Sequence, residues 1–328
     1  MENQQKLAIE VEGLTKCFGE VEALSGVDFT VISGELFGFL GPNGAGKTTT
    51  INMLTGLARP DAGAIRIGGI DCVKNPRATQ QRIGVVPDES NLYPELTGFQ
   101  NLCFCAALYG MGKAQRQERA RELLATFDLS QAADRKFATY SKGMKRKLTI
   151  AAGIIHAPEI LFLDEPTTGI DVASARRLRQ IVAALNQAGT TIFLTTHYIE
   201  EAERLCNRIA FIVSGRIVRT DTVANLVQPI QAKHVVCITC ANPLTGIQDE
   251  LEAAFADLDF SIPGPGLIRV EADHPVRVGP LVRFLEDRDA EVTEARAMRP
   301  SLEDIFVQIT GIEAKAMRHE KEKKGGGQ

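Results

Sequence analysis

A run of glycines followed by lysine and threonines at 41–49 has the composition and spacing of a phosphate-binding loop. In order, it contains Gly41, Pro42, Asn43, Gly44, Ala45, Gly46, Lys47, Thr48 and Thr49. Glycines let backbone N–H groups close around a phosphate, and the helix that follows presents its positive end to the anion. The lysine reaches the β- and γ-phosphates, and the first threonine hydroxyl is a Mg²⁺ ligand. The alternative is a chance glycine-rich turn, but the flanking strand and helix patterns favour an ATP site with Mg²⁺.

Two adjacent carboxylates end the apolar run ILFLDEP at 160–166. Charge at the end of a core strand is costly without a partner, and Mg²⁺ is the natural partner for Asp164, directly or through water. Glu165 is then placed to hold and polarise an attacking water as general base. The alternative is an ordinary acidic turn after a core strand. Together with the phosphate loop, the pair predicts ATP hydrolysis.

The spacing of apolar residues predicts the elements that must position these groups. A short strand at 35–40 leads into the phosphate loop, a helix follows at about 47–57, and 98–157 is mostly helical. Other strands are expected at 7–12, 27–32, 63–69, 82–86, 159–164 and 190–195, with a helix at 172–188. The predicted fold is an α/β P-loop NTPase core over residues 1–228 with a helical insert.

A second, smaller domain is predicted at 229–311, because the composition shifts near Pro229. Its strands are expected at 232–240, 257–262, 267–272 and 290–297, and its helices at 245–256, 276–288 and 301–309. This βαββαβ order with a last helix predicts an α+β domain of the split βαβ, ferredoxin-like layout. The lysine-rich segment 312–328 is expected to be a polar tail, disordered or partly helical.

Five motifs in one order resemble the nucleotide-binding subunit of an ABC transporter over about residues 1–225. Besides the two segments above, they are YSKGM at 140–144, GID at 169–171, and the histidine that closes the next strand. The resemblance implies an ABC-type ATPase that forms a head-to-tail homodimer with two ATP molecules between its subunits. The stretch LEDIFVQITG at 302–311 is similar to the ending of ABC-2-type drug and lipid exporters, although a plain amphipathic helix is the alternative.

The resemblance also implies roles for single residues. Ser141 and Gly143 would bind the γ-phosphate of the partner's ATP, and Asp171 would link the two sites. His197 would contact the γ-phosphate and the attacking water, as a catalytic residue beside the general base. Phe18 matches the aromatic position that stacks on adenine, while the alternative for this residue is a core phenylalanine.

Two positions depart from the family pattern. Lys142 replaces a glycine of the signature, which most often reads LSGGQ, and either contacts phosphate or points into solvent. Asp88 stands where the family commonly has glutamine, a residue that senses Mg²⁺ and the membrane partner. A carboxylate can ligate Mg²⁺ as well, so we predict Asp88 as a metal ligand. The alternatives are that it faces the permease or caps a turn after Pro87.

Composition and charge limit the remaining possibilities. The chain has 328 residues, of which 44% are hydrophobic and 24% charged, with a net charge of −4. This balance argues against a protein that coats nucleic acid. No stretch approaches the ~20 apolar residues of a membrane span, and the N-terminus lacks the blocks of a signal peptide. We therefore expect a cytosolic chain that reaches the cytoplasmic face of the membrane by docking on another protein.

The cysteines do not form a recognisable framework. There are seven in the chain, and Cys237 and Cys240 form a lone C-x-x-C without a second pair or a nearby histidine set. We expect these thiols to be reduced and to pack in a strand, with a metal or redox site as the alternative.

The leading hypothesis is the ATPase of an exporter, with a separate ABC-type membrane permease as partner. The alternative is a soluble ABC-type ATPase that acts on nucleic acid, the ribosome or an assembly machine. Such ribosomal proteins usually carry two cassettes and the DNA-repair type carries a coiled-coil or zinc insert, whereas this chain has one cassette and neither insert. A regulatory module without hydrolysis would be expected to lack Lys47 or Glu165, and both are present.

Overall fold

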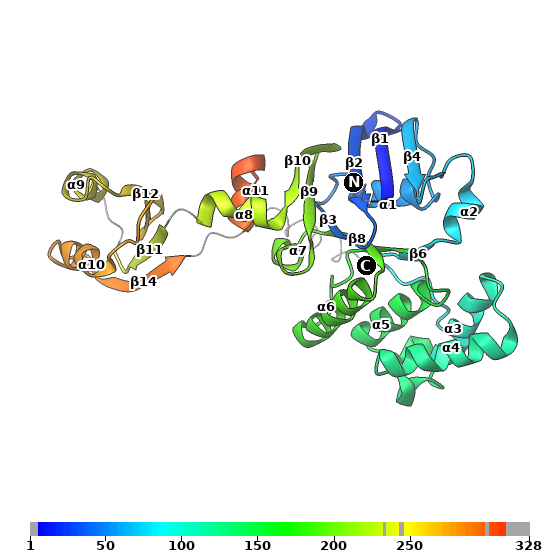
Figure 1. The fold of residues 1–328 in the computed structure, drawn as a ribbon. Helices are drawn as coiled ribbons and strands as arrows, with labels where there is room; N and C mark the ends of the chain where they lie inside the picture. Colours follow the sequence, from blue (N-terminus) through cyan, green and yellow to red (C-terminus); the bar gives the residue numbers. More distant parts are fainter. Residues whose placement is uncertain (1–5, 232–233, 243–245, 299–301, 313–328) are drawn as a thin grey trace, which may run out of the picture. The chain divides into compact units, whose positions relative to one another are not determined.

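The computed structural model describes residues 6–231, 234–242, 246–298 and 302–312, and it divides into two compact units (Figure 1). The first unit is Met1–Thr222 with Ile309–Gln328, and the second is Val223–Gln308. The division therefore precedes helix α8 (Val223–Gln231), whereas the sequence suggested a boundary after residue 228. Of the predicted tail 312–328, all but residue 312 lies outside the described residues.

A six-stranded sheet in the order β10-β9-β3-β8-β7-β6 forms the centre of the first unit. Five of its strands are parallel, and β10 pairs antiparallel at one edge. The strands are β3 (Leu36–Leu40), β6 (Ile83–Val86), β7 (Ile160–Asp164), β8 (Thr191–Thr196), β9 (Arg208–Val213) and β10 (Arg216–Thr222). Every residue of β3, β7 and β8 is buried, as expected for apolar runs in parallel strands covered on both faces.

A four-stranded antiparallel sheet in the order β2-β1-β4-β5 completes the strands of this unit. It consists of β1 (Leu7–Phe18), β2 (Val21–Ile32), β4 (Ala62–Ile67) and β5 (Ile70–Asp71). The two sheets pack through aromatic rings, with Phe29 of β2 lying 5.5 to 5.8 Å from Phe37, Phe39 and Phe193. The strands predicted at 7–12 and 27–32 are longer in the structure, because pairing continues through several register shifts to a tight turn at 19–20.

Helices cover the six-stranded sheet and form the insert. The first, α1 (Lys47–Leu54), ends before the predicted residue 57, because Gly56 adopts φ 76° just beyond the cap residue Thr55. The insert contains α3 (Gly98–Leu108), α4 (Lys113–Thr126) and α5 (Lys142–Gly153). The remaining helices are α2 (Pro76–Gln80), α6 (Val172–Gln187) and α7 (Ile199–Leu205), and α5 packs against α6 (Figure 1).

The second unit contains an antiparallel sheet in the order β12-β13-β11-β14, the split βαβ layout predicted from the order of elements. Its strands are β11 (His234–Cys240), β12 (Asp259–Gly264), β13 (Leu267–Ala272) and β14 (Val292–Met298). Its other helices are α9 (Ile247–Ala254) and α10 (Val278–Glu286), together with α11 (Leu302–Thr310) up to Gln308. One sheet face packs on α9 and α10 through a core that includes Val236, Ile238, Val270, Leu251, Leu281 and Leu285.

The lone C-x-x-C lies in β11 of this second unit. Cys240 is buried in its apolar core, Cys237 is half-buried, and both thiols are free. Among the described residues, no group of three or more His, Cys, Asp or Glu side chains is arranged to hold a metal ion. No helix within the described ranges is long and apolar enough to cross a membrane.

Candidate nucleotide-hydrolysis site

The phosphate loop connects the end of β3 to the start of α1. Two of its glycines are required by close packing. A Cβ on Gly41 would lie 2.1 Å from the carbonyl oxygen of Ile212, and Gly46 adopts φ 104° with Leu24 only 2.6 Å from where its Cβ would be. The loop therefore passes tightly over β9 and β2, which holds its backbone N–H groups in place at the N-terminus of α1.

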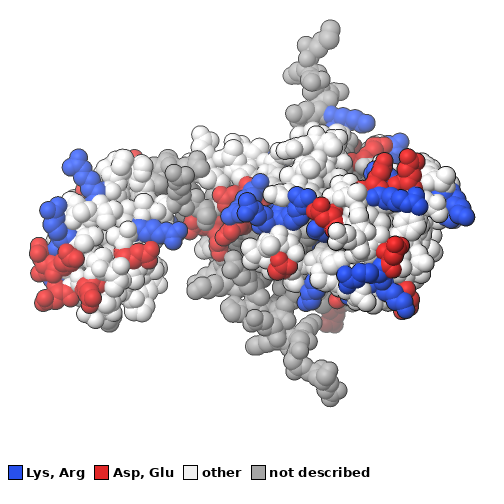
Figure 2. Space-filling view, turned by 90° about the horizontal axis from the view of Figure 1, so that it is seen from below, with Lys and Arg blue, Asp and Glu red and all other residues white. Residues whose placement is uncertain are grey.

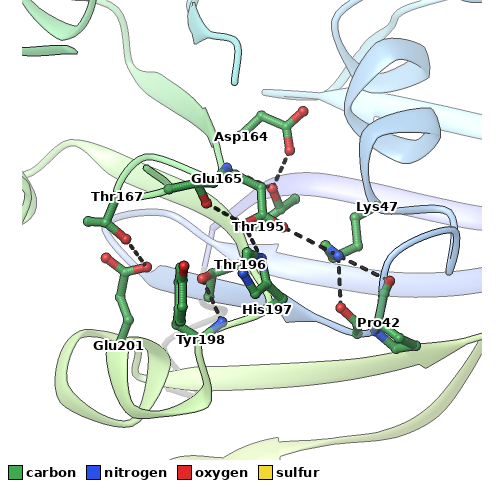
Figure 3. A network of polar contacts seen from close by, with 12 residues as sticks. Pro42, Lys47, Asp164, Glu165, Thr167, Thr195, Thr196, His197, Tyr198 and Glu201 are labelled. Carbon is green, nitrogen blue, oxygen red and sulfur yellow. Dashed lines mark hydrogen bonds and ion pairs between the residues drawn. The ribbon is translucent and has the colours of Figure 1, made fainter. Parts of the chain in front are cut away.

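Lys47 is the first residue of α1 and its side chain is buried inside the loop. Its Nζ donates to the carbonyl oxygens of Gly41 at 2.8 Å and Pro42 at 3.1 Å (Figure 3). The same Nζ lies 3.4 Å from Oε1 of Glu165, and both side chains are at most 7% exposed. The structure therefore brings the predicted phosphate-binding lysine and the predicted general base into one ion pair.

Asp164 ends β7 and faces the start of α1. Thr48 Oγ1 donates to its Oδ2 at 3.1 Å, and Thr195 Oγ1 donates to its Oδ1 at 2.5 Å. Burial raises the pKa of the Asp164 carboxyl above its ordinary value, although the bonds from the two hydroxyls act in the opposite direction. A buried carboxylate of this kind is stabilised when a cation binds beside it.

The oxygen atoms around Asp164 suit Mg²⁺. This ion prefers hard oxygen ligands and is usually bound through one or two carboxylates together with substrate phosphates. Thr48 supplies a hydroxyl and Asp164 a carboxylate 3.1 Å apart. Thr48 lines a cavity that Asp88 also lines. The residues present therefore fit the metal that normally accompanies ATP.

Glu165 follows β7 in a left-handed backbone conformation with φ 49°, which is uncommon for a residue with a side chain. Its Oε2 lies 2.5 Å from Nδ1 of His197 and accepts a hydrogen bond from Thr168 at 3.0 Å. Burial raises the pKa of this carboxyl, but the hydrogen bond from His197 and the charge of Lys47 outweigh it, so the pKa lies below its ordinary value. The carboxylate is thus ionised at neutral pH, as a general base requires.

A cavity of about 250 Å³ collects six of the twelve predicted ATP-binding residues, together with Asp88 and Glu165. The lining residues are Val21, Glu22, Ala23, Asn43, Gly44, Gly46, Lys47, Thr48, Thr49, Asp88 and Glu165. The parallel strands explain this convergence, because the loop after β3 and the acids after β7 meet at the carboxyl edge of the sheet. Register places Asp164 beside Thr195, and Leu40 beside Thr196 just before His197.

Other predicted residues lie outside this cavity. Ser141 caps α5 and Asp171 caps α6, each accepting a hydrogen bond from the backbone N–H three residues on. Gly143 packs against α6, since a Cβ there would lie 2.5 Å from Oγ of Ser174. Within one chain, the signature segment is therefore at the junction of α5 and α6 and does not line the phosphate-loop cavity.

Phe18 lies at the end of β1 and is 55% exposed, which contradicts a core role for this ring. It pairs with Val21, a residue of the cavity wall, and Lys16 Nζ lies 5.4 Å from the centre of its ring. An exposed aromatic ring beside the phosphate loop is available for stacking. Lys142 is also exposed, at the first turn of α5.

Three residues of the site were missed by sequence reasoning. Thr195 bonds to Asp164, and Thr168 bonds to Glu165. Arg146 of α5 is buried and donates to the backbone on both sides of the metal site. A threonine in an apolar strand, or one arginine within the sequence KRK, carries no local signal that separates it from its neighbours.

A further buried pair extends the polar network toward α7. Thr167 Oγ1 donates to Oε2 of Glu201 at 3.0 Å (Figure 3), while Oε1 of this glutamate has no hydrogen-bond partner. Burial raises the pKa of the Glu201 carboxyl, although the nearby hydroxyls of Thr167 and Thr196 act to lower it. The hydrogen bond to Glu201 holds Thr167, and with it the segment between Glu165 and the start of α6, against α7.

Parallel strands, a glycine-rich loop between β3 and the N-terminus of α1, and two carboxylates at the end of β7 define a P-loop nucleotide-hydrolysing protein. Solved structures agree with this class. The chain is similar to an ATP-binding subunit of an ABC transporter, with TM-score 0.62 and 32% identity over 68% of this chain and 92% of that chain. It is also similar to a dimeric ATP-binding cassette in a post-hydrolysis state with ADP and Pi, with TM-score 0.61 and 27% identity over 66% and 98% of the two chains.

Sequence comparison identifies the family. The ABC transporter model matches residues 24–168. A linearmycin resistance ATP-binding protein of Bacillus subtilis is 35% identical over 92% of this chain and 98% of its own length. A daunorubicin/doxorubicin resistance ATP-binding protein of Streptomyces peucetius is 38% identical over 95% and 94%, and a Nod factor export ATP-binding protein I of Paraburkholderia xenovorans is 38% identical over 93% and 98%.

The chain therefore belongs to the family of ABC transporter ATP-binding subunits, in the group that resembles ABC-2-type exporter ATPases, and it is an ATPase. The predicted fold class and the predicted enzymatic activity are both confirmed.

Proposed function

We propose that this chain powers the export of an organic compound through a separate membrane permease, to which it binds at the cytoplasmic face of the membrane. The relatives named above carry drug resistance or Nod factor export in their names and align with almost the whole chain. The observation that carries the proposal is the complete set of hydrolytic groups, Lys47, Glu165 and His197, held within one buried network.

In the proposed mechanism, the phosphate loop binds the β- and γ-phosphates of ATP. The Lys47 ammonium group exchanges its hydrogen bonds with the loop carbonyls for hydrogen bonds to phosphate oxygens. Its ion pair with Glu165 is thereby replaced by an ion pair with the nucleotide. Thr48, Asp164 and Asp88 would hold Mg²⁺, which neutralises charge that develops on the phosphates. Thr195 keeps the Asp164 carboxylate oriented during this exchange.

Glu165 would then activate the attacking water. Its Oε2 is oriented by His197 and Thr168, and its Oε1 is released when Lys47 turns to the nucleotide. The freed oxygen accepts the proton of the water as this attacks the γ-phosphate. His197 holds the carboxylate in this orientation through Nδ1 and would contact the γ-phosphate and the attacking water.

A second chain would complete each site. Because Ser141 and Gly143 do not line the cavity of their own chain, we propose that they contact ATP bound to a partner subunit. Asp171, at the cap of α6, would then lie between the two sites and link them. Phe18 would stack on the adenine at the outer end of the cavity.

The permease would dock on an exposed aromatic cluster of the helical insert. Tyr93, Phe104, Leu108 and Tyr109 are 40 to 71% exposed, and the rings of Tyr93 and Phe104 lie 5.1 Å apart. Tyr93 follows the loop at 87–88 after a short segment, and Asp88 of this loop lines the phosphate-loop cavity. An apolar cytoplasmic segment of the permease that covers the cluster would thus be linked to the state of the nucleotide.

The second unit contains no phosphate loop in its sequence, and we propose that it is an accessory module outside catalysis.

The charge distribution favours a protein partner over nucleic acid. On the face of the described residues drawn in Figure 2, Lys and Arg side chains lie beside Asp and Glu side chains, in keeping with the net charge of −4. Nucleic-acid binding instead relies on a basic surface.

Transport in membrane vesicles tests the proposal. The chain is produced together with a candidate ABC-type membrane permease, and ATP-dependent uptake of dye or drug substrates into inside-out vesicles is measured. Uptake should require both proteins and should be absent with the Glu165→Gln variant. Hydrolysis of ATP that is neither stimulated by the permease nor coupled to uptake would contradict the export function while leaving the ATPase intact.

A further inference from the structure

Arg146 lies on the buried face of α5 and is 7% exposed. Its guanidinium donates four hydrogen bonds, all to backbone carbonyl oxygens. Nε donates to Pro166 at 2.9 Å and Nη2 to Asp164 at 2.6 Å, while Nη1 donates to Asp88 at 3.1 Å and also to Pro87. One side chain therefore binds two separate loops that line the metal site.

The two loops come from strands that are far apart in the sequence but adjacent in the sheet. The loop at 87–88 follows β6, and the segment 164–166 spans the end of β7 and the residues beyond it. Each loop carries one proposed Mg²⁺ ligand, Asp88 and Asp164 respectively. In the hydrogen bonds given above, Arg146 connects the two loops directly, and it does so from the helix that begins with the signature segment.

The charge of Arg146 also matters at this position. Asp88 and Glu165 line one cavity, Asp164 accepts a hydrogen bond from Thr48 of the cavity wall, and ATP adds further negative charge. Burial lowers the pKa of the guanidinium, while the nearby carboxylates, Asp88 first among them, act to raise it. Since an arginine is protonated in proteins in any case, it is a fixed positive charge behind two metal ligands that would otherwise repel each other.

We propose that Arg146 is a positioning residue for the metal site: it clamps the loops after β6 and β7 together so that Asp88 and Asp164 face the same Mg²⁺. The inference rests on the proposed assignment of these two carboxylates to the metal. The geometry needs arginine in particular, because the planar guanidinium offers five N–H donors in a fixed fork, whereas lysine offers three and glutamine two.

Three variants test this role. Arg146→Gln removes the charge and at least two of the four bonds, and Arg146→Lys keeps the charge but not the fork. Lys147→Gln is the matched control, because it removes the next cation of the same helix, whose Nζ lies 3.7 Å from Asp128 and away from the metal site. Each full-length variant is checked for folding by circular dichroism and gel filtration.

Two readouts are compared. The first is the Mg²⁺ concentration that half-saturates ATP hydrolysis, together with kcat and the KM for ATP at saturating Mg²⁺. The second is the affinity for Mn²⁺, used in place of Mg²⁺ and with ADP present, measured by electron paramagnetic resonance. This readout does not depend on turnover. We expect Arg146→Gln to weaken both metal readouts by about tenfold and to change the KM for ATP by less than about threefold, with an intermediate effect for Arg146→Lys. Lys147→Gln should match the wild type.

An unchanged metal dependence in folded Arg146→Gln would overturn the proposal. If that variant does not fold, Arg146→Lys decides: a shift of about threefold in Mn²⁺ binding supports the clamp, and a wild-type titration refutes it. If the wild type itself shows no Mg²⁺-dependent hydrolysis, the proposed function fails, and not only the role of Arg146.

Discussion

Replacing Glu165 by glutamine is the sharpest test of the hydrolytic centre. The substitution keeps the shape of the side chain and removes its charge. In the structure, that charge faces Lys47 at 3.4 Å and His197 at 2.5 Å. A glutamine at this position can still accept a hydrogen bond from Thr168 or His197, but it cannot take a proton from water.

The size of the effect follows from these contacts. General-base catalysis contributes roughly 10²–10⁴-fold, which corresponds to about 3–5 kcal/mol in the activation free energy. ATP binding should be retained in the variant. In the wild type, Glu165 competes with the ATP phosphates for the charge of Lys47, and the substitution removes this competition. At an effective dielectric constant of ~20, this pair at 3.4 Å is worth about 5 kcal/mol before desolvation is subtracted. Glu165→Gln should therefore bind ATP at least as tightly as the wild type and accumulate an ATP-bound dimer.

Single-turnover hydrolysis and gel filtration measure the two outcomes. The variant should turn over roughly 10²–10⁴-fold more slowly and elute as a dimer in ATP but not in ADP.

The pH dependence gives a second check. Because the pKa of Glu165 is lowered, its carboxylate contributes stability above the pKa of about 4.3 of an unfolded chain, and loses it as the pH falls through the lower folded value. The wild-type rate should accordingly show no loss from Glu165 protonation near neutral pH. Near-native turnover in the variant would refute the assignment.

Three further predictions concern the shared site, the buried network and the adenine contact. Inactive Lys47→Ala and Ser141→Arg chains, when mixed, should regain ATPase activity through one intact site per heterodimer, and no recovery between two folded variants would contradict the shared site. Glu201→Gln should raise Tm, measured by calorimetry, by about 2–4 °C at pH 8 and by less at pH 5. The reason is that the folded protein raises the pKa of the Glu201 carboxyl, so the wild type loses stability as the pH rises and this group ionises. Equal shifts in Tm at both pH values would exclude ionisation of Glu201 as the cause. Phe18→Ala should raise the KM for ATP by about tenfold without changing Tm, because the ring is 55% exposed; a large fall in Tm would indicate packing instead.

Much of the fold could be predicted because its determinants are local. The strand before the phosphate loop, the buried runs at 160–164 and 191–196 and the split βαβ order of the second unit follow from apolar periodicity and turn residues. Strand lengths in the antiparallel sheet were underestimated, because β1 and β2 remain paired through register shifts that interrupt the alternation on which the prediction depends. The strands β9 and β10 and the helix α7 were not assigned either, although β9 carries the backbone on which Gly41 rests.

The sequence by itself determined the phosphate loop and the pair Asp164 and Glu165, because each is a run of consecutive residues whose chemistry needs only a strand before it. The tertiary structure decided what surrounds them. Arg146 donates hydrogen bonds to the carbonyl oxygens of Asp88 and Pro87, which lie 58 and 59 positions away in the sequence. Thr195 donates to Asp164, which is 31 positions away. The sequence KRK at 145–147 presents three neighbouring cations, and only the packing of α5 against the sheet selects which one is buried. Contacts of this kind depend on the order of strands in the sheet, which local periodicity does not record.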